Sequence, residues 1–295
     1  MQLLITGGTG FIGSVLCSRL LEDQHDITVL SRQPDAVKAP LKGISELEQL
    51  ASDATFDIVI NLAGEPIADK RWSDKQKQRI INSRLDITQN LIHYFKTTLH
   101  KPKVFISGSA IGYYGIGETD DYVDESAQGD ESFSSQLCQQ WESTALQAQA
   151  LGIRTCLLRT GIVLGKGGGA LSKMLPPFKL GLGGRMGQGK HWMPWIHIDD
   201  LVGIILHCIQ HDNLNGGING TSPNPVTNQF FTTTLGKVLK RPSIFPMPAF
   251  VIKLLMGQMG EELLLAGKKI LPTKALNSGY QFKYKELEEA LINVV

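Results

Sequence analysis

Short runs of apolar, β-branched residues alternate along the chain with longer segments in which apolar residues recur every three or four positions. Five of the short runs predict strands: Leu3–Thr6, Ile27–Leu30, Ile58–Leu62, Val104–Ser107 and Thr155–Leu158. Continuous apolar runs of this length are typical of parallel strands that are covered on both faces. Their alternation with helices predicts an α/β fold built on a doubly wound parallel sheet of the Rossmann type.

Helical periodicity in the longer segments predicts which side chains face the sheet, because residues three and four positions apart share a face. The expected inward faces are Phe11, Ile12, Val15, Leu16 and Leu20 in the first helix, Ile81, Leu85, Ile92 and Phe95 in a long second one, Leu137, Trp141, Ala145 and Ala148 in a third, and Leu287, Ala290, Leu291 and Val294 in the last. A further strand is expected over Met193–Ile198, followed by a helix with Asp199 or Asp200 as its N-cap.

The composition of the chain changes after Arg159, and the stretch 165–189 is rich in glycine. Such a stretch either binds or closes over a ligand, or it is an ordinary irregular connection, and the sequence supports both readings equally. We expect a Rossmann domain over residues 1–225, with substrate-lobe segments from about residue 160, and a small C-terminal domain over 240–295. Together the later segments predict a smaller, mixed α/β lobe that receives the substrate.

Composition excludes several classes of protein. A net charge of +1 over 295 residues offers no broad positive field, so we expect no nucleic-acid and no membrane partner. A strand pattern starts at Gln2 with no basic stretch before it, which predicts a cytoplasmic protein. The four cysteines have no paired spacing, which favours reduced core thiols over disulfides or a metal site: Cys17, Cys138, Cys156 and Cys208.

The first predicted strand leads directly into a glycine array on Gly7, Gly10 and Gly13, with Phe11 and Ile12 inside it. Glycines in this position allow a tight turn and a close approach of backbone to a pyrophosphate, and the following helix offers its free N–H groups to the phosphates. The context between a strand and an amphipathic helix strengthens a motif that is weak by itself. It predicts a dinucleotide site.

The end of the second predicted strand indicates which dinucleotide is bound. Ser31 and Arg32 stand where an acidic residue would hold the ribose hydroxyl of NAD. An arginine there can bond to a 2′-phosphate, so we expect NADP(H) to be preferred over NAD(H) by roughly tenfold to a hundredfold. A solvated surface arginine is the alternative interpretation. After the third strand, the segment Leu62, Ala63 and Gly64, with two small residues, would let the backbone approach the adenine-ribose side of the cofactor. We call the site between this segment and the glycine turn the cradle.

A succession of motifs resembles a known superfamily: GGTGFIG, NLAG, ISGSAIGYYG, LRTGIVLG and WIHIDDLV follow one another over roughly residues 1–225. They resemble the extended short-chain dehydrogenases/reductases of the epimerase/dehydratase branch. The segments GEPIADKRW and GGALSKMLPPFKLGLGG, with the proline-rich C-terminal extension, are similar to an atypical bacterial group of epimerase family proteins that has a small C-terminal domain of unknown role. The resemblance implies hydride chemistry with NAD(P) and, by analogy, that a two-fold homodimer is one available assembly.

The catalytic residues that the resemblance implies are only partly present. The serine is kept as Ser109, but the motif alignment places Ser134 at the tyrosine position and Cys138 at the lysine position. A lysine beside the tyrosine lowers the pKa of the phenol, so the loss of both removes the usual acid/base pair. Arg84 occupies the place of a supporting asparagine, where its charge could also lie near the nicotinamide.

Other side chains are candidates for the lost roles. Tyr113, near Ser109, is a candidate phenolic proton donor, with packing in a turn as the alternative. For the substrate we expect Arg71 and Trp72 to clamp an anionic or planar ligand, and His191 and Trp195 to form pocket walls. A solvated charged loop is an equally good interpretation of the first pair.

Two functions follow from these residues. The first is an NADP(H)-binding, epimerase-like oxidoreductase that acts on a small carbonyl, alcohol or sugar-nucleotide substrate, with Ser109 orienting the substrate oxygen and the cofactor carrying the hydride. The second is a regulatory protein that binds NADP(H), or senses its redox state, and catalyses nothing. The intact cofactor motifs, Ser109 and the glycine-rich stretch favour the first, whereas the missing tyrosine and lysine favour the second. We favour the enzyme by a small margin, because lost catalytic groups can be replaced from elsewhere in a pocket.

Overall fold

A seven-stranded parallel sheet forms the centre of the molecule. The computed structural model describes residues 1–50, 53–117 and 120–295. The order of the strands across the sheet is β11-β7-β5-β4-β1-β2-β3. Their bounds are Gln2–Thr6 for β1, Asp26–Leu30 for β2, Lys42–Ile44 for β3, Ile58–Asn61 for β4, Val104–Ala110 for β5, Arg154–Thr160 for β7 and Gly216–Gly220 for β11. The predicted doubly wound Rossmann-type sheet and its five central strands are confirmed.

The two strands at the edges of the sheet, β3 and β11, were not expected. Strand β3 has no buried residue, and β11 is the glycine-rich run GGING. Neither has the apolar run by which a strand is recognised in a sequence, and both are added to the sheet by pairing with a neighbour, β2 or β7.

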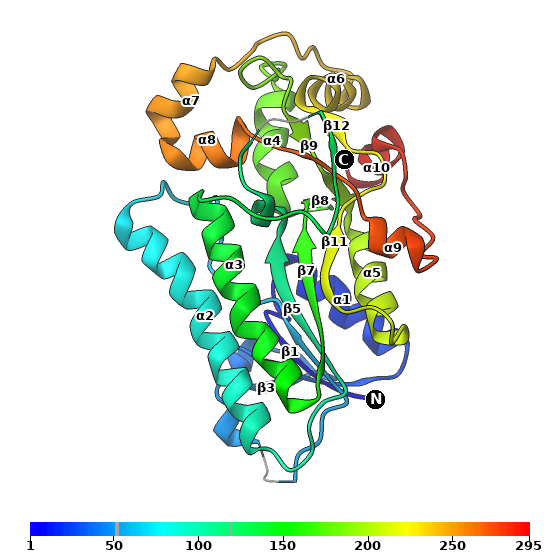
Figure 1. The fold of residues 1–295 in the computed structure, drawn as a ribbon. Coiled ribbons are helices and arrows are strands. Elements are labelled where there is room, and N and C mark those ends of the chain that lie inside the picture. The colour runs from blue at the N-terminus through cyan, green and yellow to red at the C-terminus, as the bar shows by residue number, and fades with distance from the viewer. Residues whose placement is uncertain (51–52, 118–119) are drawn as a thin grey trace.

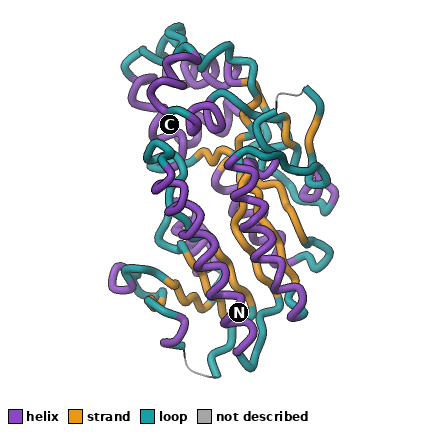
Figure 2. The backbone as a smooth tube through the Cα atoms, turned by 60° about the vertical axis from the view of Figure 1, so that its left-hand side comes forward, coloured by secondary structure: helices purple, strands orange, loops and turns teal. Residues whose placement is uncertain are grey.

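Helices cover both faces of the sheet, as Figures 1 and 2 show. Helices α1 (Phe11–Glu22) and α5 (Ile198–Gln210) pack on one face, and α2 (Asp74–Thr97) and α3 (Phe133–Leu146) on the other. Short 3-10 segments lie at Pro34–Ala36, Leu47–Gln49, Ile111–Tyr114 and Gln147–Leu151. Because helices lie on both faces, side chains at the carboxyl ends of the central strands, such as Asn61 and Ser109, are buried between the layers.

A second lobe stands beyond the carboxyl ends of the strands, at the top of Figure 1. It contains β8 (Ile162–Leu164) paired with β10 (Trp195–His197), and β9 (Trp192–Met193) paired with β12 (Val226–Thr227). Helices α4 (Gly169–Lys179), α6 (Asn228–Leu239) and α10 (Leu287–Val294) share an apolar core with these strands. All four side chains expected on the inward face of the last helix are buried.

The strand expected over Met193–Ile198 is wrong in its extent. Pro194 separates β9 from β10, which pair with different partners, and Ile198 already begins α5. The cap of α5 also differs from the expectation, because the N-cap is His197, whose Nδ1 accepts from the Asp199 N–H at 3.1 Å. Asp200 instead accepts from the backbone N–H groups of Lys283 and Tyr284 at 2.7 and 2.9 Å, which ties α5 to the C-terminal segment.

The C-terminal segment continues with α7 (Ala249–Met256), α8 (Gln258–Leu264), β13 (Lys269–Ile270) and α9 (Thr273–Asn277) before α10. It is bonded to earlier parts of the chain, since β13 pairs in parallel with β6 (Tyr122–Val123). The four cysteines are free and buried. Across residues 1–50, 53–117 and 120–295, no helix is long and apolar enough to cross a membrane.

Candidate functional site

The turn after β1 brings three backbone segments into contact at the carboxyl edge of the sheet. Gly7 has a φ of +70° and lies so close to the end of β4 that a Cβ atom on it would stand 2.7 Å from the Leu62 carbonyl carbon. Gly13 is equally crowded, because its Cβ would stand 2.1 Å from the Gly7 carbonyl oxygen. Only glycine fits at either position, so the turn leaves its outer surface as bare backbone.

The N-terminus of α1 points out of this turn without a side-chain cap. Its N-cap is Gly10, which has no side chain, and no capping hydrogen bond from a side chain is found there among the described residues. Free N–H groups and the positive end of the helix dipole form an anion-binding site. Phe11 and Ile12, the first two helical residues, are half-buried beside it.

Phe11 also contacts the glycine-rich stretch that the sequence left unassigned. A Cβ atom on Gly168 would stand 2.2 Å from Phe11 Cδ2, and one on Gly165 would stand 2.8 Å from Phe11 Cζ. The glycines of this stretch therefore accommodate the ring of the dinucleotide turn. That the stretch binds or closes over a ligand, one of the two readings of the sequence, stays a prediction, but its contact with the glycine turn is consistent with it.

A buried polar network fixes the ends of β1 and β4. Thr6 Oγ1 donates to Asn61 Oδ1 at 2.6 Å, and Asn61 Nδ2 donates to Thr88 Oγ1 of α2 at 2.9 Å. Thr6 Oγ1 also accepts from the Ala63 N–H at 3.2 Å. The backbone of Leu62–Gly64 is therefore held at a set distance from the glycine turn.

Arg32 follows β2 with its side chain exposed, and makes no hydrogen bond or ion pair within the described parts of the chain. Ser31 Oγ accepts from the Gln33 N–H at 3.1 Å, which turns the backbone outward at this point. The guanidinium is thus free to bind an anion above the end of β2.

Arg84 lies beside the other end of the cradle. Its guanidinium carbon would stand 3.1 Å from a Cβ atom on Gly64, and Nη1 donates to the carbonyls of Glu65 and Ile80 at 3.1 Å each. Its Cζ lies 5.2 Å from the centre of the Trp141 ring. Burial lowers the pKa of Arg84, and no carboxylate forms an ion pair with it among the described residues. A half-buried cation without an acidic partner is well suited to hold an anionic ligand.

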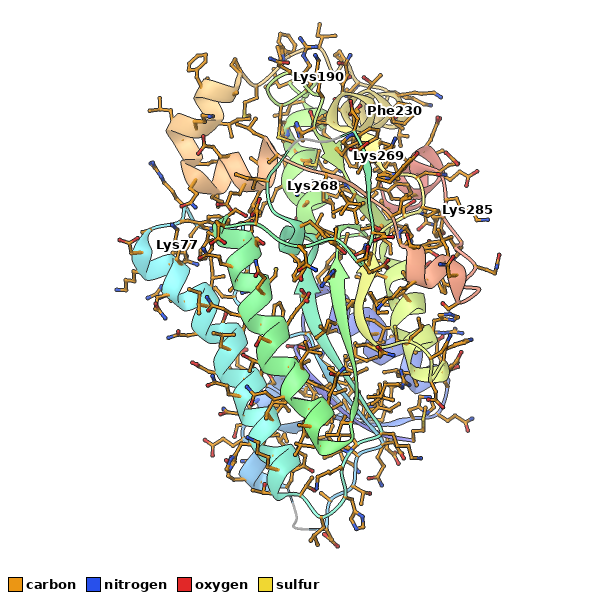
Figure 3. The ribbon with its side chains drawn as sticks, viewed as in Figure 1. Lys77, Lys190, Phe230, Lys268, Lys269 and Lys285 are labelled. Carbon is orange, nitrogen blue, oxygen red and sulfur yellow. The ribbon has the colours of Figure 1, made fainter. Side chains whose placement is uncertain are left out.

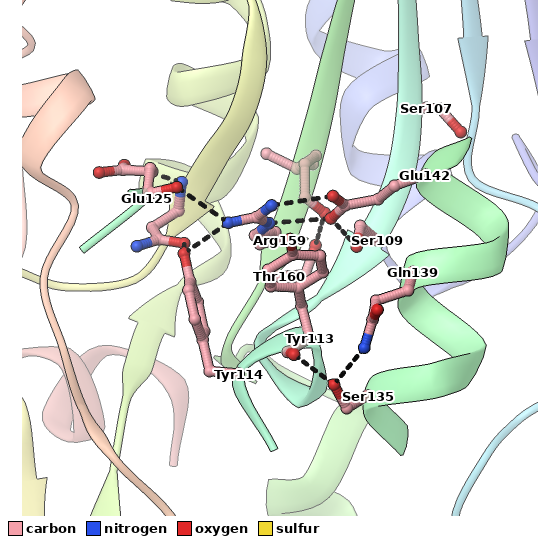
Figure 4. A network of polar contacts seen from close by, with 12 residues as sticks. Ser107, Ser109, Tyr113, Tyr114, Glu125, Ser135, Gln139, Glu142, Arg159 and Thr160 are labelled. Carbon is pink, nitrogen blue, oxygen red and sulfur yellow. Dashed lines mark hydrogen bonds and ion pairs between the residues drawn. The ribbon is translucent and has the colours of Figure 1, made fainter. Parts of the chain in front are cut away.

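Ser109 belongs to a chain of buried polar groups drawn in Figure 4. Its hydroxyl donates to Glu142 Oε1 at 2.7 Å, and Arg159 holds the same carboxylate in a fork, with Nε and Nη2 at 2.8 and 2.9 Å. Arg159 Nη1 donates to the Tyr114 hydroxyl at 2.9 Å. Burial opposes the charge of Arg159, but the hydrogen bonds and charge of Glu142 raise the pKa of the guanidinium overall. With Ser109 only 5 % exposed, its proton is directed into the protein.

The Ser109 network ends on strand β11. The Tyr114 hydroxyl donates to Asn219 Oδ1 at 2.7 Å, and burial raises the pKa of Tyr114 to about 12. Tyr114 is therefore protonated at neutral pH and acts as a fixed donor. Tyr113 differs, since it is half-buried and its ring lies over Arg159 Cζ at 3.5 Å.

The position that the resemblance assigns to the tyrosine is covered by the C-terminal segment. Ser134 donates to Glu262 Oε2 of α8 from both Oγ and N, at 2.6 and 2.9 Å, and the Phe133 N–H donates to Oε1 at 3.2 Å. Glu262 thus caps the first turn of α3 from another helix. Four residues on, the buried Cys138 stands at the lysine position, and burial raises the pKa of its thiol to about 11. Neither side chain reproduces the usual acid/base pair.

A cavity of about 980 Å³ opens next to this cap, between the segment before α3 and helices α7 and α8. Its lining includes Asp130, Glu131, Lys253 and Glu262.

The sequence analysis missed Glu262 and Arg159 as site residues. Glu262 lies far along the chain from the serine that it contacts, and Arg159 directly follows an apolar run in its strand. The described residues contain no group of three or more histidine, cysteine or acidic side chains that could hold a metal ion.

Three residues expected to contact the substrate are core residues instead. Trp72 is 8 % exposed, packs edge-on against Phe133 at 4.8 Å, and donates from Nε1 to the Ile67 carbonyl. Trp195 has no exposed surface and donates from Nε1 to the Asn224 carbonyl. His191 is 7 % exposed, and burial lowers its pKa to about 4. These three expectations are corrected: the rings are buried inside the protein, and the sequence does not distinguish a buried ring from one that faces a ligand.

Arg71, the fourth expected substrate residue, is exposed. Its guanidinium lies beside the junction of α7 and α8, where a Cβ atom on Gly257 would stand 3.1 Å from Nη2. The loop from Glu65 to Arg71 therefore reaches the C-terminal segment, although the residue beside it, Trp72, is part of the core.

Comparison with known proteins gives consistent matches along the chain. The sequence model of the NAD dependent epimerase/dehydratase family matches residues 3–219, and that of a domain of unknown function, DUF1731, matches residues 247–294. The chain is 40% identical to the chloroplastic "Epimerase family protein SDR39U1 homolog" of Arabidopsis thaliana, covering 99% of this chain and 86% of the relative. It is 35% identical to "Epimerase family protein YfhF" of Bacillus subtilis, covering 100% and 98%.

A solved structure agrees with these sequences. The crystal structure of human epimerase family protein SDR39U1 (isoform 2) with NADPH superposes with a TM-score of 0.89 at 35% identity, covering 100% of this chain and 99% of the human one. The human protein therefore shares the whole arrangement of the two lobes described above.

Proposed function

Because the chain belongs to the NAD dependent epimerase/dehydratase family, we propose that it binds NADP(H) in the cradle between the glycine turn and the end of β4. The observation that carries this proposal is the bare backbone at Gly7 and Gly13, where a Cβ atom would stand 2.7 and 2.1 Å from neighbouring backbone. Together with the uncapped α1 it fits a pyrophosphate. The NADPH in the human relative's structure supports the same choice of cofactor.

The remaining cofactor contacts follow from the positions of the side chains. Ser31 and the unpaired Arg32 would hold the 2′-phosphate at the end of β2, in place of a carboxylate. Gly10, Phe11 and Ile12 would line the phosphates. Leu62, Ala63 and Gly64 would lie along the ribose, and Arg84 would add a charge at the inner end.

We propose further that the protein is an epimerase-like oxidoreductase for a small carbonyl, alcohol or sugar-nucleotide substrate. When bound, the nicotinamide supplies or accepts a hydride. Ser109 donates its own proton to Glu142, so its free lone pairs would accept a hydrogen bond from a substrate hydroxyl. The half-buried phenol of Tyr113 would exchange the proton, since its neighbour Tyr114 is held as a donor to Asn219.

A second function has an observation in its favour. Ser109 is engaged by Glu142, Ser134 is engaged by Glu262, and Cys138 is a buried neutral thiol. All three inherited catalytic positions are thus occupied by groups that stabilise the fold. This favours a protein that binds NADP(H) as a regulatory ligand, without turnover. The cytoplasmic location stays a prediction, and the homodimer rests on the superfamily analogy alone.

Titration of NADPH and NADH against the wild type and Arg32→Ala tests the cofactor proposal. We expect NADPH affinity to fall at least about tenfold in the variant, because only NADPH carries the 2′-phosphate that Arg32 would bind. NADH binding should stay weak in both proteins. Arg19→Ala is the matched control, since Arg19 is an exposed arginine at the far end of α1 that pairs with Glu22. Equal binding of the two nucleotides by the wild type would overturn the assignment of Arg32.

Transfer of deuterium from 4-deuterated NADPH to a panel of carbonyl compounds separates the two functions. Turnover that Ser109→Ala lowers by about a hundredfold or more supports the oxidoreductase, within the range typical of a positioned proton-transfer group. Turnover that the variant leaves unchanged removes Ser109 from the mechanism. Tight NADPH binding with no deuterium transfer to any compound is the result that the regulatory function predicts.

A further inference from the structure

Helix α7 leaves most of its apolar residues in contact with solvent. Of its eight residues only Ile252 is buried, whereas Phe250, Leu254 and Leu255 are 71, 73 and 62% exposed. A surface helix normally buries its apolar face against the core. This one turns it away from the molecule, at the outer end of the second lobe in Figure 1.

The apolar face of α7 continues onto two neighbouring segments. The segment before α7 exposes Ile244, Phe245 and Met247 by 74, 54 and 44%, and the end of α4 with the turn after it exposes Leu180 and Leu182 by 75 and 58%. Backbone bonds join the two segments, since the Phe245 N–H donates to Gly183 at 3.1 Å and the Met247 N–H to Arg185 at 2.9 Å. We call these eight exposed side chains, together, the outer apolar surface.

Basic residues surround the outer apolar surface, and acidic ones are missing from its sequence. Residues 160–198 and 213–260 contain nine lysines and arginines and no aspartate or glutamate. Three of the nine pair with acids elsewhere: Lys173, Lys237 and Lys253. The other six are exposed and form no ion pair within the described parts of the chain: Lys166, Lys179, Arg185, Lys190, Lys240 and Arg241. The net charge of +1 for the whole chain averages over this asymmetry.

Five of the six unpaired basic residues, all but Lys166, lie around the apolar side chains. Arg241 Nε donates to the Lys179 carbonyl at 3.0 Å, so the two residues are neighbours at the end of α4. A Cβ atom on Gly189 would stand 3.2 Å from the Arg185 side chain, which places Lys190 close to it. Figure 3 shows Lys190 at the same end of the molecule as α7.

We propose that the outer apolar surface docks on an anionic lipid bilayer. Phenylalanine and leucine side chains rimmed by lysine and arginine are the pattern of a protein that lies in the membrane interface, with the apolar groups in the acyl boundary and the cations on the headgroups. A second copy of this chain fits less well, because a two-fold contact would bring the unpaired cations of the two rims together, and the nearby Glu261 and Glu288 already pair with Lys253 and Lys237. The protein then docks peripherally, with α7 and the end of α4 at the membrane.

Co-sedimentation of the full chain with sucrose-loaded vesicles of phosphatidylcholine and phosphatidylserine in a two-to-one ratio tests this proposal. We expect binding to these vesicles and little to phosphatidylcholine alone, with loss at high salt. Lys179→Gln with Lys240→Gln should lower the partition coefficient about fivefold for each charge removed. Phe250→Gln with Leu254→Gln should lower it at least tenfold, since two inserted side chains are lost.

The matched control is Leu99→Gln with Lys101→Gln, at the opposite end of the sheet, where Leu99 is 78% exposed. Binding that this variant loses as strongly as the α7 variant overturns the proposal. So does an absence of binding to anionic vesicles. If the wild type is instead a dimer by sedimentation velocity, and Phe250→Gln with Leu254→Gln makes it monomeric, the surface is an interface between copies and the membrane assignment is wrong.

Discussion

At the scale of single residues, the turn after β1 is bare backbone at Gly7 and Gly13, and Arg32 lies exposed beyond the end of β2. Trp72 and Trp195 are buried instead, by partners from other segments of the chain. The glycines could be predicted because a tight turn leaves a local pattern in the sequence. The burial of the two indoles could not, because tryptophan looks the same in a sequence whether it packs in a core or faces a ligand. The role of Arg32 stays a prediction.

The burial of His191 has a consequence for stability against pH. Burial lowers the pKa of His191 from 6.5 to about 4, so between these pH values the imidazole is protonated in the unfolded chain but not in the folded protein. The free energy of unfolding should therefore be undiminished above pH 6.5 and fall as the pH drops towards 4, by up to about 1.4 kcal/mol per pH unit. Urea unfolding of wild type and His191→Asn at a series of pH values measures the difference. An identical slope in both proteins contradicts the prediction.

At the scale of elements, the strands and helices of the Rossmann part follow from apolar periodicity, but the contacts between distant segments do not. Neither the pairing of β13 with β6 nor the cap that α8 places on α3 has a local signal. Residues 128 positions apart supply this cap, and only the packing of α8 against Trp72 and Leu137 brings them together. Elements added by pairing, such as β11, are missed for the same reason.

The contact of Phe11 with the glycine-rich stretch predicts an effect on cofactor binding from outside the dinucleotide motif. In Gly168→Ala the new methyl group would stand 2.2 Å from Phe11 Cδ2, so the ring must move. We expect NADPH affinity to fall about tenfold, together with a loss of about 1–3 kcal/mol in the free energy of unfolding.

Gly167→Ala separates this steric effect from backbone strain. Gly167 has a φ of +75° but no heavy atom within 4 Å of its would-be Cβ. The variant should cost about 1–2 kcal/mol of stability and leave NADPH affinity nearly unchanged. Equal losses of affinity in the two variants, measured by fluorescence titration, would show that the ring contact is not the cause.

The cap between α8 and α3 predicts a local change in backbone protection. Glu262→Ala removes the acceptor for two backbone N–H groups and one hydroxyl, so we expect a loss of about 1–2 kcal/mol in stability. Hydrogen exchange should accelerate in the first turn of α3 and in α8. Glu261→Gln is the control, because Glu261 pairs with the exposed Lys253 and should change stability by less than about 0.5 kcal/mol. Uniform exchange throughout the chain in Glu262→Ala argues against the cap.

At the scale of the whole molecule, the fold class and the family could be predicted from the sequence. The distribution of charged and apolar side chains over the surface could not. The bulk charge predicts a protein with no charged face, but acidic residues are absent from two long stretches that fold side by side. The superfamily analogy is also weaker at this scale. Helices α2 and α3, which would pair in a homodimer, have no large apolar side chain among those exposed in the described parts of the chain.

The polar outer faces of α2 and α3 predict a single chain in solution. Sedimentation velocity at micromolar concentration, without lipid, should give the 32.3 kDa mass of one copy. An apolar contact area of the usual extent is missing from the two helices, so a stable pair through them is not expected. A dimer that persists in Phe250→Gln with Leu254→Gln would restore the pairing of α2 with α3.

The bond between Ser134 and Glu262 also limits which substitutions this architecture tolerates. Ser134 is 4 % exposed, and a Cβ atom on Gly112 would stand 3.0 Å from the Cβ of Ser134. A tyrosine at position 134 would need the volume that the Glu262 carboxylate and its helix fill. A phenol therefore fits at position 134 only if position 262 carries a smaller side chain, so the two positions form one unit for protein engineering.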